Sequence, residues 1–425
     1  MQRENIKMTK YFLNSLIKAS RKYLMKLETA HTAPNYKPSL PIVIKKSLDT
    51  RVYDTDNKPF YDFLSAYSAV NQGHLHPKII EAAVEQMKFC TLPSRAYYND
   101  IFPLYAQKIT KLMGFDHVIP MNTGAEAVET ACKLARRWGY RIKHIPPQQA
   151  HIVSIKGCFH GRTLFPISFS NDPDCQDDFG PFAQNIIKVE FNNLDQVRKI
   201  FEQKGKNICS IIIEPIQGEA GVKIPSPGYL KSLQKLCNKH NILLIADEIQ
   251  TGLGRTGKML ACDWEDVKPD ILILGKALGA GIYPVSAVLA NKHISEVLVH
   301  GSHGSTFGGN PLACKVATTS LDVLLDEGLI DNANCLGNIF RCKIKEANIP
   351  AIKEIRGKGL LNAIELVSPC DTSQIVSDLA FKDGIMTKAI DSKTIRFSPP
   401  LTFKKEEFKD CVDLIIKRLK SIEIK

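Results

Sequence analysis

Apolar runs of strand length alternate with amphipathic segments of helix length between Asn71 and about Asn310. SIIIEPI and ILLIADE are typical of the runs, and GAEAVETACKLARRWGY has the apolar spacing of a helix. Strands separated by helices form parallel sheets that are covered on both faces. We therefore expect an α/β fold with a mainly parallel sheet, and ligands bind such sheets beyond the carboxyl ends of their strands.

The segments on either side of this region have different patterns. Before it, RVYDTDNKPFYDF alternates apolar and polar residues around a turn and predicts a hairpin. After Pro311 come an amphipathic helix, the strand-like LLNAIEL and a closing helix rich in Lys and Ile, which indicate a smaller α+β domain. We expect an N-terminal segment over residues 1–67, a large domain over 68–316 and a small C-terminal domain over 317–425.

Composition excludes several classes of protein. The chain has 425 residues, and none of its apolar runs approaches the roughly 20 residues that span a bilayer, so a membrane protein is not expected. Its 12 cysteines form no CxxC pair, so we expect reduced thiols, no disulfide scaffold and no metal site. The net charge of +12 is spread along the chain without a nucleic-acid-binding motif, which favours anionic small molecules over nucleic acid as partners.

The N-terminal 26 residues carry seven Lys or Arg and one acid. This composition leaves the role of the segment open. Residues 1–18 can be a flexible extension or a mitochondrial presequence. From about Ser20, the segment can instead be the first folded helix. We expect a cytoplasmic protein, with the mitochondrial matrix as the alternative.

Polar residues stand where two apolar runs end. The run Ile242 to Ala246 is followed by Asp247, and ILIL is followed by Gly275 and Lys276 within GKALGAG. Each side chain alone is typical of a solvated strand end or a helix cap. Together they suit pyridoxal phosphate (PLP), which needs a lysine for its aldehyde and an acid for its pyridine nitrogen. The small residues around Lys276 would let such a ligand approach closely.

A PLP site also needs a place for the phosphate. Gly124 and Ala125 begin a long helical pattern, where backbone N–H groups and the helix dipole favour an anion. The small-residue loop HGSTFGGNP adds the hydroxyls of Ser305 and Thr306. Taken alone, the stretch at Gly124 and Ala125 can also be an ordinary glycine turn that precedes a helix and binds no ligand.

The chain resembles the class III aminotransferases of fold type I, essentially without a break from Asn35 to Pro400. The resemblance is carried, in the family's order, by FLSAYSAVNQGH, PMNTGAEAVETACKLARRWGY, FHGRT, EPIQGEAG, ADEIQTGLGRTG, LGKALGAGIYPVSAVLA, HGSTFGGNP and IRGKGLLNAIE. It implies a large domain with a mainly parallel seven-stranded sheet covered by helices, a smaller α+β C-terminal domain and an N-terminal segment. It also implies PLP as the cofactor.

The resemblance assigns roles around the cofactor. Lys276 becomes the lysine that binds the cofactor aldehyde and carries a proton during the reaction, and Asp247 becomes the partner of the pyridine nitrogen. Phe159 would stack on the ring, and Gln250 would lie near the phenolic oxygen. Members of the family often have an aromatic residue at the place of His160, so we assign it no chemical role.

The resemblance also implies a homodimer with shared active sites. In this family Thr306, and with it Ser305, would reach the phosphate of the cofactor in the neighbouring subunit. Isolated protomers would then be inactive.

The match is closest to members that transfer the δ-amino group of L-ornithine to 2-oxoglutarate by a ping-pong route, giving glutamate 5-semialdehyde and glutamate. Arg162 and Arg396 would bind substrate carboxylates, because guanidinium pairs with carboxylate bidentately. Glu219 would cover Arg396 while ornithine is bound and move away for 2-oxoglutarate. Tyr36 and Tyr67 would surround the α-amino acid group of ornithine, although Pro34 departs from the usual histidine before Asn35.

Other activities remain open on the sequence. Relatives that act on N-acetylornithine or 4-aminobutyrate share the fold and generally lack the two tyrosines. A glutamate-1-semialdehyde-type aminomutase also shares the fold but needs no external oxo acid. A binding protein without activity would be expected to have lost Lys276 or Asp247, and both are present.

Overall fold

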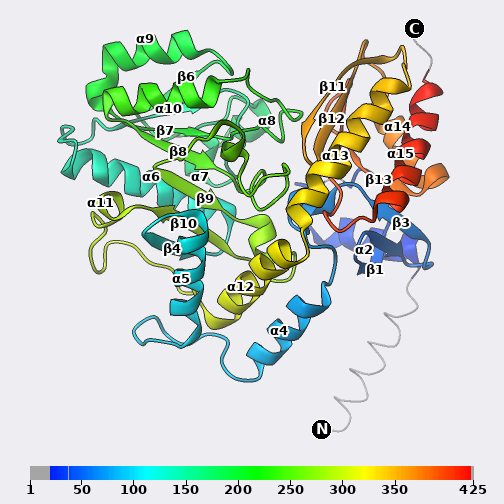
Figure 1. Ribbon diagram of the computed structural model, residues 1–425, viewed down its shortest axis with the longest axis horizontal. Helices are drawn as coiled ribbons and strands as arrows, with labels where there is room; N and C mark the ends of the chain where they lie inside the picture. Colours follow the sequence, from blue (N-terminus) through cyan, green and yellow to red (C-terminus); the bar gives the residue numbers. More distant parts are fainter. Residues whose placement is uncertain (1–19, 37, 423–425) are drawn as a thin grey trace.

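The computed structural model describes residues 20–36 and 38–422 and contains three sheets (Figure 1). The largest has seven strands, in the order β4 (His117–Met121), β10 (Ser286–Ala290), β9 (Ile271–Leu274), β8 (Leu243–Asp247), β7 (Ile208–Ile213), β5 (His151–Ile155) and β6 (Ile186–Val189). Strand β10 is antiparallel to both of its neighbours, and the other pairs are parallel. The mainly parallel seven-stranded sheet is therefore confirmed.

Strand direction decides where polar side chains meet. Strands β5, β7, β8 and β9 run the same way, and β4 runs with them because β10 is antiparallel to both β4 and β9. The carboxyl ends of these strands therefore share one edge of the sheet. Asp247 ends β8 at that edge, and the segments that follow the other strands carry Phe159, Glu214, Lys276 and Gly124 to it.

The sheet separates two hydrophobic cores. Successive residues of one strand alternate between them: Ile211 packs into one core and Ile212 into the other, and Leu272 and Ile273 divide in the same way. Helix α6 (Gly124–Arg141) covers one face with a fully buried stripe that includes Val128. Burial on both faces explains why the sequence shows continuous apolar runs for these strands.

The small domain contains an antiparallel sheet in the order β11 (Ile352–Lys358), β12 (Leu361–Leu366), β15 (Thr394–Phe397) and β14 (Lys388–Ala389). Helices α13 (Leu329–Glu346), α14 (Thr372–Asp383) and α15 (Lys405–Lys420) lie beside it, on the right of Figure 1. Predicted as an α+β unit, this domain has the expected strand at LLNAIEL and the expected closing helix.

The N-terminal segment joins the small domain. Strands β1 (Ile44–Leu48), β2 (Arg51–Asp54) and β3 (Pro59–Asp62) form an antiparallel sheet, and β13 (Ile385–Met386) adds to it in parallel with β3. The predicted hairpin is therefore β2–β3. Helix α2 (Arg21–His31) begins after Ser20, whose Oγ accepts the Tyr23 N–H at 3.3 Å. This agrees with the alternative in which the first folded helix begins near Ser20. The predicted extension over residues 1–18 lies outside the described residues.

The remaining elements complete the large domain and the connections. They are α3 (Ser65–Ser68), α4 (Pro77–Met87), α5 (Ile101–Met113), α7 (Leu164–Ile167), α8 (Pro173–Gln176), α9 (Leu194–Lys204), α10 (Tyr229–His240), α11 (Lys292–Ser295) and α12 (Pro311–Asp326), with 3₁₀ turns η1 (Gly205–Asn207), η2 (Ala261–Glu265) and η3 (Lys276–Gly279). The predicted domain boundary between residues 316 and 317 falls inside α12, which is one continuous helix. Within residues 20–36 and 38–422, no helix has the length and apolarity needed to cross a membrane.

Candidate active site

A cavity of about 400 Å³ lies at the carboxyl edge of the large sheet. It is lined by Lys276, Gly124, Asn122, Ala69 and residues 281–285. Lys276 follows β9, and Gly124 begins α6 after β4, so neighbouring parts of the sheet deliver both to one cavity. The structure therefore brings the predicted lysine and the predicted anion-binding helix start together.

Lys276 is held in an unusual conformation and environment. Its φ is 43°, in the left-handed region, which costs a non-glycine residue on the order of 1–3 kcal/mol and is typical of functional sites. Burial lowers the pKa of its amine, although Glu219 and Asp247 partly offset this effect by attracting the positive charge. A lysine with a lowered pKa has a larger neutral fraction and is a better nucleophile and base.

Asp247, the last residue of β8, is bound by His160. The Nδ1 atom of His160 lies 2.7 Å from Asp247 Oδ2, and the Ile249 N–H donates to Asp247 Oδ1 at 3.1 Å. Burial opposes the charged imidazolium, but Cys158 and the bond to Asp247 outweigh it, so the pKa of His160 lies well above its usual value. The family resemblance assigns His160 no chemical role, and its position directly after the predicted ring-stacking residue is the sequence signal that could have indicated one.

Glu214 is a second buried acid that sequence reasoning missed. It directly follows β7, as Asp247 ends β8, and its Oε1 accepts the Phe159 N–H at 2.8 Å. Burial raises the pKa of Glu214 to about 7, with His160 lowering it and Asp247 raising it. Glu214 therefore fixes the backbone of the segment that presents Phe159, and its place at a strand end was the signal for it.

The start of α6 is prepared to bind an anion. Thr123 Oγ1 accepts the Glu126 N–H at 3.2 Å, and Glu126 Oε2 accepts the Thr123 and Asn122 N–H groups at 2.8 and 3.0 Å. This capping box leaves the N–H groups of Gly124 and Ala125 without acceptors inside the helix. A Cβ at Gly124 would lie 3.1 Å from Ile249 Cδ1, so glycine suits this crowded cavity wall.

Ser305 and Thr306 lie close to the same helix start but in a different hollow. Ser305 Oγ accepts the Asn122 side-chain N–H at 3.0 Å, which links its loop to the cavity. Thr306 is exposed, and both residues line a surface hollow of about 550 Å³ with residues 92–96 and Gly304. The structure therefore does not place the Thr306 side chain in the Lys276 cavity of its own chain, and its role stays a prediction.

Glu219 and Arg396 form a buried ion pair. Arg396 Nη1 lies 2.7 Å from Glu219 Oε1, and Gln250 Nε2 donates to the same oxygen at 3.0 Å. Burial would raise the pKa of Glu219, but the charge of Arg396 and its hydrogen bond dominate and lower it to about 2. Arg396 is 1% exposed, and its Nε and Nη2 atoms have no partner among the described residues. Those buried donors suit a carboxylate that enters the site.

Tyr67 lies against Arg396. The Arg396 guanidinium is 5.3 Å from the centre of the Tyr67 ring, and Lys388 Nζ donates to the Tyr67 hydroxyl at 3.3 Å. All four residues of α3 have positive φ, between 45° and 74°, so this turn is left-handed. Asp62 Oδ1 holds its entrance by accepting the Leu64 and Ser65 N–H groups at 2.8 Å. Such costly backbone in non-glycine residues is typical of functional segments.

Among the described residues, Arg162 contacts another predicted site residue, whereas Tyr36 does not. The Arg162 guanidinium lies 5.5 Å from the centre of the Phe159 ring, and its Nη1 donates to Cys175 Sγ at 3.0 Å. Tyr36 is 83% exposed and is not brought against the other site residues. The predicted contact of Tyr36 with substrate therefore stays a prediction.

These groups fit PLP. Lys276 offers an amine for the aldehyde, Asp247 an acid for the ring nitrogen and the start of α6 free N–H groups for the phosphate. The Oε1 atom of Gln250 is buried without a partner in the described part of the chain, which leaves a polar atom for a ligand. Gly218 allows Gln250 to take this position, since a Cβ there would lie 1.5 Å from Gln250 Oε1.

Comparison with known proteins agrees with this geometry. The family model for class-III aminotransferases matches residues 32–419. The mitochondrial ornithine aminotransferase of Oryza sativa subsp. japonica is 52% identical over 390 residues, covering 90% of this chain and 82% of the rice protein. The crystal structure of ornithine aminotransferase from Toxoplasma gondii ME49 is 41% identical with a TM-score of 0.93, covering 96% of this chain and 97% of that one. The crystal structure of acetylornithine aminotransferase from Elizabethkingia anophelis is 46% identical with a TM-score of 0.86, covering 95% of this chain and 99% of that one.

The family model spans nearly the whole length of the chain, and the relatives match it closely. This chain therefore belongs to the class-III aminotransferases.

Proposed function

We propose that this chain transfers the δ-amino group of L-ornithine to 2-oxoglutarate, giving glutamate 5-semialdehyde and glutamate. The observation that carries the proposal is the buried Glu219–Arg396 pair, in which Arg396 keeps two buried donors free. The rice and Toxoplasma relatives, both named ornithine aminotransferases, support it. Aminotransferases of class III use PLP, and we expect the same cofactor here.

We infer which residues would hold the cofactor. Lys276 would bind its aldehyde, Asp247 its ring nitrogen and Phe159 its ring face, with Gln250 near the phenolic oxygen. The N–H groups of Gly124 and Ala125 would bind its phosphate. When bound, PLP supplies an electron-accepting ring that stabilises negative charge on the substrate carbon.

The protein's own groups would move and hold the protons. The lowered pKa of Lys276 increases the share of neutral amine, which can accept the proton from the amino-bearing carbon and deliver it again. Asp247 is kept in place by His160 and the Ile249 N–H, so its carboxylate can hold a proton on the ring nitrogen in one orientation.

Substrate selection would use the Glu219–Arg396 pair in two ways. With Glu219 in place, Arg396 is neutralised and cannot attract the α-carboxylate of ornithine, so the δ-amine enters the site. The α-carboxylate would instead lie near Arg162, Tyr36 and Tyr67. When 2-oxoglutarate enters, the carboxylate next to its oxo carbon would displace Glu219 and use the Arg396 donors that the pair leaves free. Its distal carboxylate would then lie near Arg162, where the α-carboxylate of ornithine lay.

We further propose that the active unit is a homodimer. Ser305 and Thr306 would bind the phosphate held by the other subunit, since Thr306 is exposed on its own chain. The exposed aromatic residues Tyr97 and Tyr98 adjoin the hollow that Ser305 and Thr306 line, and they suit burial by a second copy. Sedimentation combined with activity assays over a dilution series would test this, because dissociation should remove activity.

The experiment that tests the function is a steady-state assay of the purified, PLP-loaded enzyme. Ornithine with 2-oxoglutarate should give glutamate and the cyclised product pyrroline-5-carboxylate in equal amounts. N-acetylornithine and 4-aminobutyrate should react far more slowly, and a preference for either would assign a sister activity. Product formed from glutamate 1-semialdehyde without any oxo acid would indicate an aminomutase and overturn the proposal.

For location, we propose the cytoplasm, with the mitochondrial matrix as the alternative if residues 1–18 are a presequence. Fluorescent fusions of the chain with and without residues 1–18 would decide between them.

A further inference from the structure

The segment that carries Glu219 is a short closed loop, which we call the Glu219 loop (residues 217–223). Its base is closed by two backbone hydrogen bonds between Gln217 and Lys223, of 3.1 and 3.0 Å. Inside it, Gly218 C=O accepts the N–H groups of Gly221 and Val222, both at 3.3 Å. The loop is thus a compact unit, and the position of Glu219 depends on how the unit is held.

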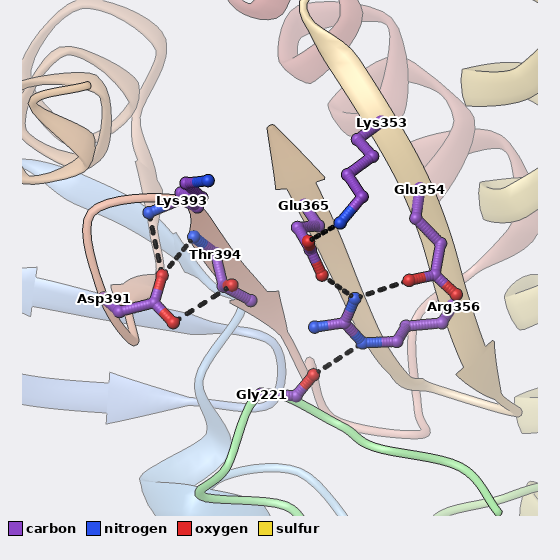
Figure 2. A network of polar contacts seen from close by, with 8 residues as sticks. All are labelled: Gly221, Lys353, Glu354, Arg356, Glu365, Asp391, Lys393 and Thr394. Atoms are coloured by element: carbon purple, nitrogen blue, oxygen red, sulfur yellow. Dashed lines mark hydrogen bonds and ion pairs between the residues drawn. The ribbon is translucent and has the colours of Figure 1, made fainter. Parts of the chain in front are cut away.

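The small-domain sheet holds this loop. Arg356 on β11, Ala363 on β12 and Arg396 on β15 are direct cross-strand partners, so their side chains share one face. Arg396 binds the loop at Glu219, and its Nη1 also donates to Gly218 C=O at 3.3 Å. Arg356 binds it at the other end, where its Nε donates to Gly221 C=O at 2.8 Å (Figure 2).

Small and apolar residues between the two arginines let the loop lie close to the sheet. Val222 packs with Leu361 and Ala363 in a separate buried cluster. Gly221 has a φ of 94°, and a Cβ there would lie 3.2 Å from Arg356 Nη2 and 3.3 Å from Thr394 Cγ2. The loop therefore reaches the sheet through a glycine where a side chain would interfere with Arg356.

Arg356 is itself held rigidly. Its Nη1 lies 2.8 Å from Glu354 Oε2 and 2.5 Å from Glu365 Oε2, and Lys353 Nζ lies 2.7 Å from the other Glu365 oxygen (Figure 2). The Arg356 side chain is 12% exposed. Lys353 belongs to the same charge network, but the contacts drawn in Figure 2 do not join it to the loop. Arg356 and Lys353 are thus two cations of one network, and only Arg356 contacts Gly221, so Lys353 is a suitable control.

We propose that Arg356 is a specificity-positioning residue, which anchors the Glu219 loop on the small domain so that Glu219 covers Arg396. This inference deepens the proposed function and rests on it. Without Arg356, the loop loses the side-chain hydrogen bond at Gly221, while Arg396 and Gln250 still bind Glu219 at its other end. Glu219 then leaves Arg396 more often. Arg396 then attracts the α-carboxylate of ornithine, and more of the substrate presents its α-amine.

The test compares Arg356→Met with Lys353→Met in the PLP-loaded enzyme. After a single turnover of ornithine, Arg356→Met should raise the ratio of α- to δ-transamination about tenfold, as expected for a lost charge-assisted hydrogen bond. Its KM for 2-oxoglutarate should fall or stay the same, because Arg396 is more available. Lys353→Met should match the wild type, and Arg356→Lys, which keeps one donor and the charge, should lie between.

A readout without substrate separates anchoring from activity. Amide hydrogen exchange of the peptide that contains residues 217–223 should be about tenfold faster in Arg356→Met and unchanged in Lys353→Met. The proposal would be overturned if Arg356→Met had the same exchange rate and product ratio as the wild type. It would also be overturned if Lys353→Met changed them as much as Arg356→Met does. If Arg356→Met does not fold, Gly221→Ala disturbs the same contact from the side of the loop. Unchanged exchange of residues 217–223 in Gly221→Ala would then overturn the proposal.

The two proposals can fail separately. If the wild-type enzyme does not use ornithine but Arg356→Met still accelerates exchange of the loop, the anchoring role stands and the proposed substrate is wrong. If the enzyme transfers the δ-amine of ornithine and Arg356→Met changes neither ratio nor exchange, only the anchoring role is wrong.

Discussion

Glu219 Oε1 lies 2.7 Å from Arg396 Nη1, in an ion pair between a loop of the large domain and strand β15 of the small domain. The Arg396 side chain is 1% exposed and that of Glu219 is 25% exposed. The carboxylate can therefore leave toward solvent, whereas the guanidinium is fixed. This difference makes Glu219 the part of the pair that would move when a substrate carboxylate arrives.

Removing the charge of Glu219 should reduce discrimination between the two amines of ornithine. Glu219→Gln keeps a polar side chain of similar size but does not neutralise Arg396. We expect the ratio of α- to δ-transamination to rise about 10- to 100-fold, which corresponds to roughly 1.5–3 kcal/mol for a bond to a charged group. Mass spectrometry of the products after a single turnover measures this ratio, and an unchanged ratio would remove Glu219 from substrate selection.

The same ratio in the wild-type enzyme should not depend on pH between 6 and 9. The pKa of Glu219 is lowered to about 2, so its charge and the pairing are fully present above its unfolded value of about 4.3 and are lost only as the pH falls toward 2. Product ratios measured across that range check this. A ratio that changes with a midpoint near neutral pH would mean that another group controls selection.

Replacing Lys276 should abolish turnover without unfolding the protein. Lys276→Ala removes both the amine proposed to bind the cofactor and the proposed proton carrier, and loss of the proton carrier alone costs about 10²–10⁴-fold in rate. Because burial opposes the charge of the Lys276 amine and lowers its pKa, removing this amine should not lower the free energy of unfolding greatly. Activity and thermal unfolding of Lys276→Ala and of the exposed surface control Lys292→Ala measure both effects, and a Lys276→Ala enzyme that turns over at the wild-type rate would exclude the assignment.

The His160–Asp247 pair should make stability depend on pH. Because the pKa of His160 is raised in the folded protein, its stabilisation is complete below about pH 6.5 and is lost as the pH rises through that raised value. His160→Asn keeps a donor that does not titrate, so its free energy of unfolding should fall less between pH 6 and pH 9. Urea unfolding of both proteins at the two pH values tests this, with Cys158 and Glu214 as the other titratable groups nearby. Parallel pH dependence in both would mean that His160 does not titrate with folding.

Gly337 of α13 should be sensitive for reasons unrelated to catalysis. A Cβ there would lie 1.8 Å from the carbonyl oxygen of Gly359, which is backbone and cannot turn away. Gly337→Ala should therefore destabilise the small domain by about 1–3 kcal/mol, the usual cost of overpacking. Chemical unfolding compared with Lys345→Ala, an exposed position of the same helix, measures the loss, and equal stability of the two variants would contradict the packing seen here.

Periodicity in the sequence predicted the large sheet and two of its functional strand ends. Asp247 and Lys276 could be predicted because continuous apolar runs end directly before Asp247 and one residue before Lys276, and parallel strands place such ends at one edge. Glu214 ends a run in the same way but was passed over, because nothing in the sequence indicates that its carboxylate binds the Phe159 N–H 55 residues away. Local patterns therefore find candidates, but tertiary partners decide their roles.

Other parts of the site depend on geometry that local patterns do not encode. Glu219 and Arg396 are 177 residues apart, and their pairing was predicted only through the family resemblance. The left-handed turn at residues 65–68 contains no glycine, and Asp62 binds the backbone at its entrance. The alignment of Arg356 with Arg396 follows from the register of three strands, which a single sequence does not specify.

The most direct test of δ-amino transfer is to follow one nitrogen atom. The PLP-loaded enzyme would be reacted with L-ornithine labelled with ¹⁵N only at the δ-nitrogen, freed of excess substrate and then given 2-oxoglutarate. We expect glutamate that carries the label, in an amount equal to the enzyme's active sites. Unlabelled glutamate would show that the α-amine is transferred, and no glutamate from ornithine at all would contradict the proposed function.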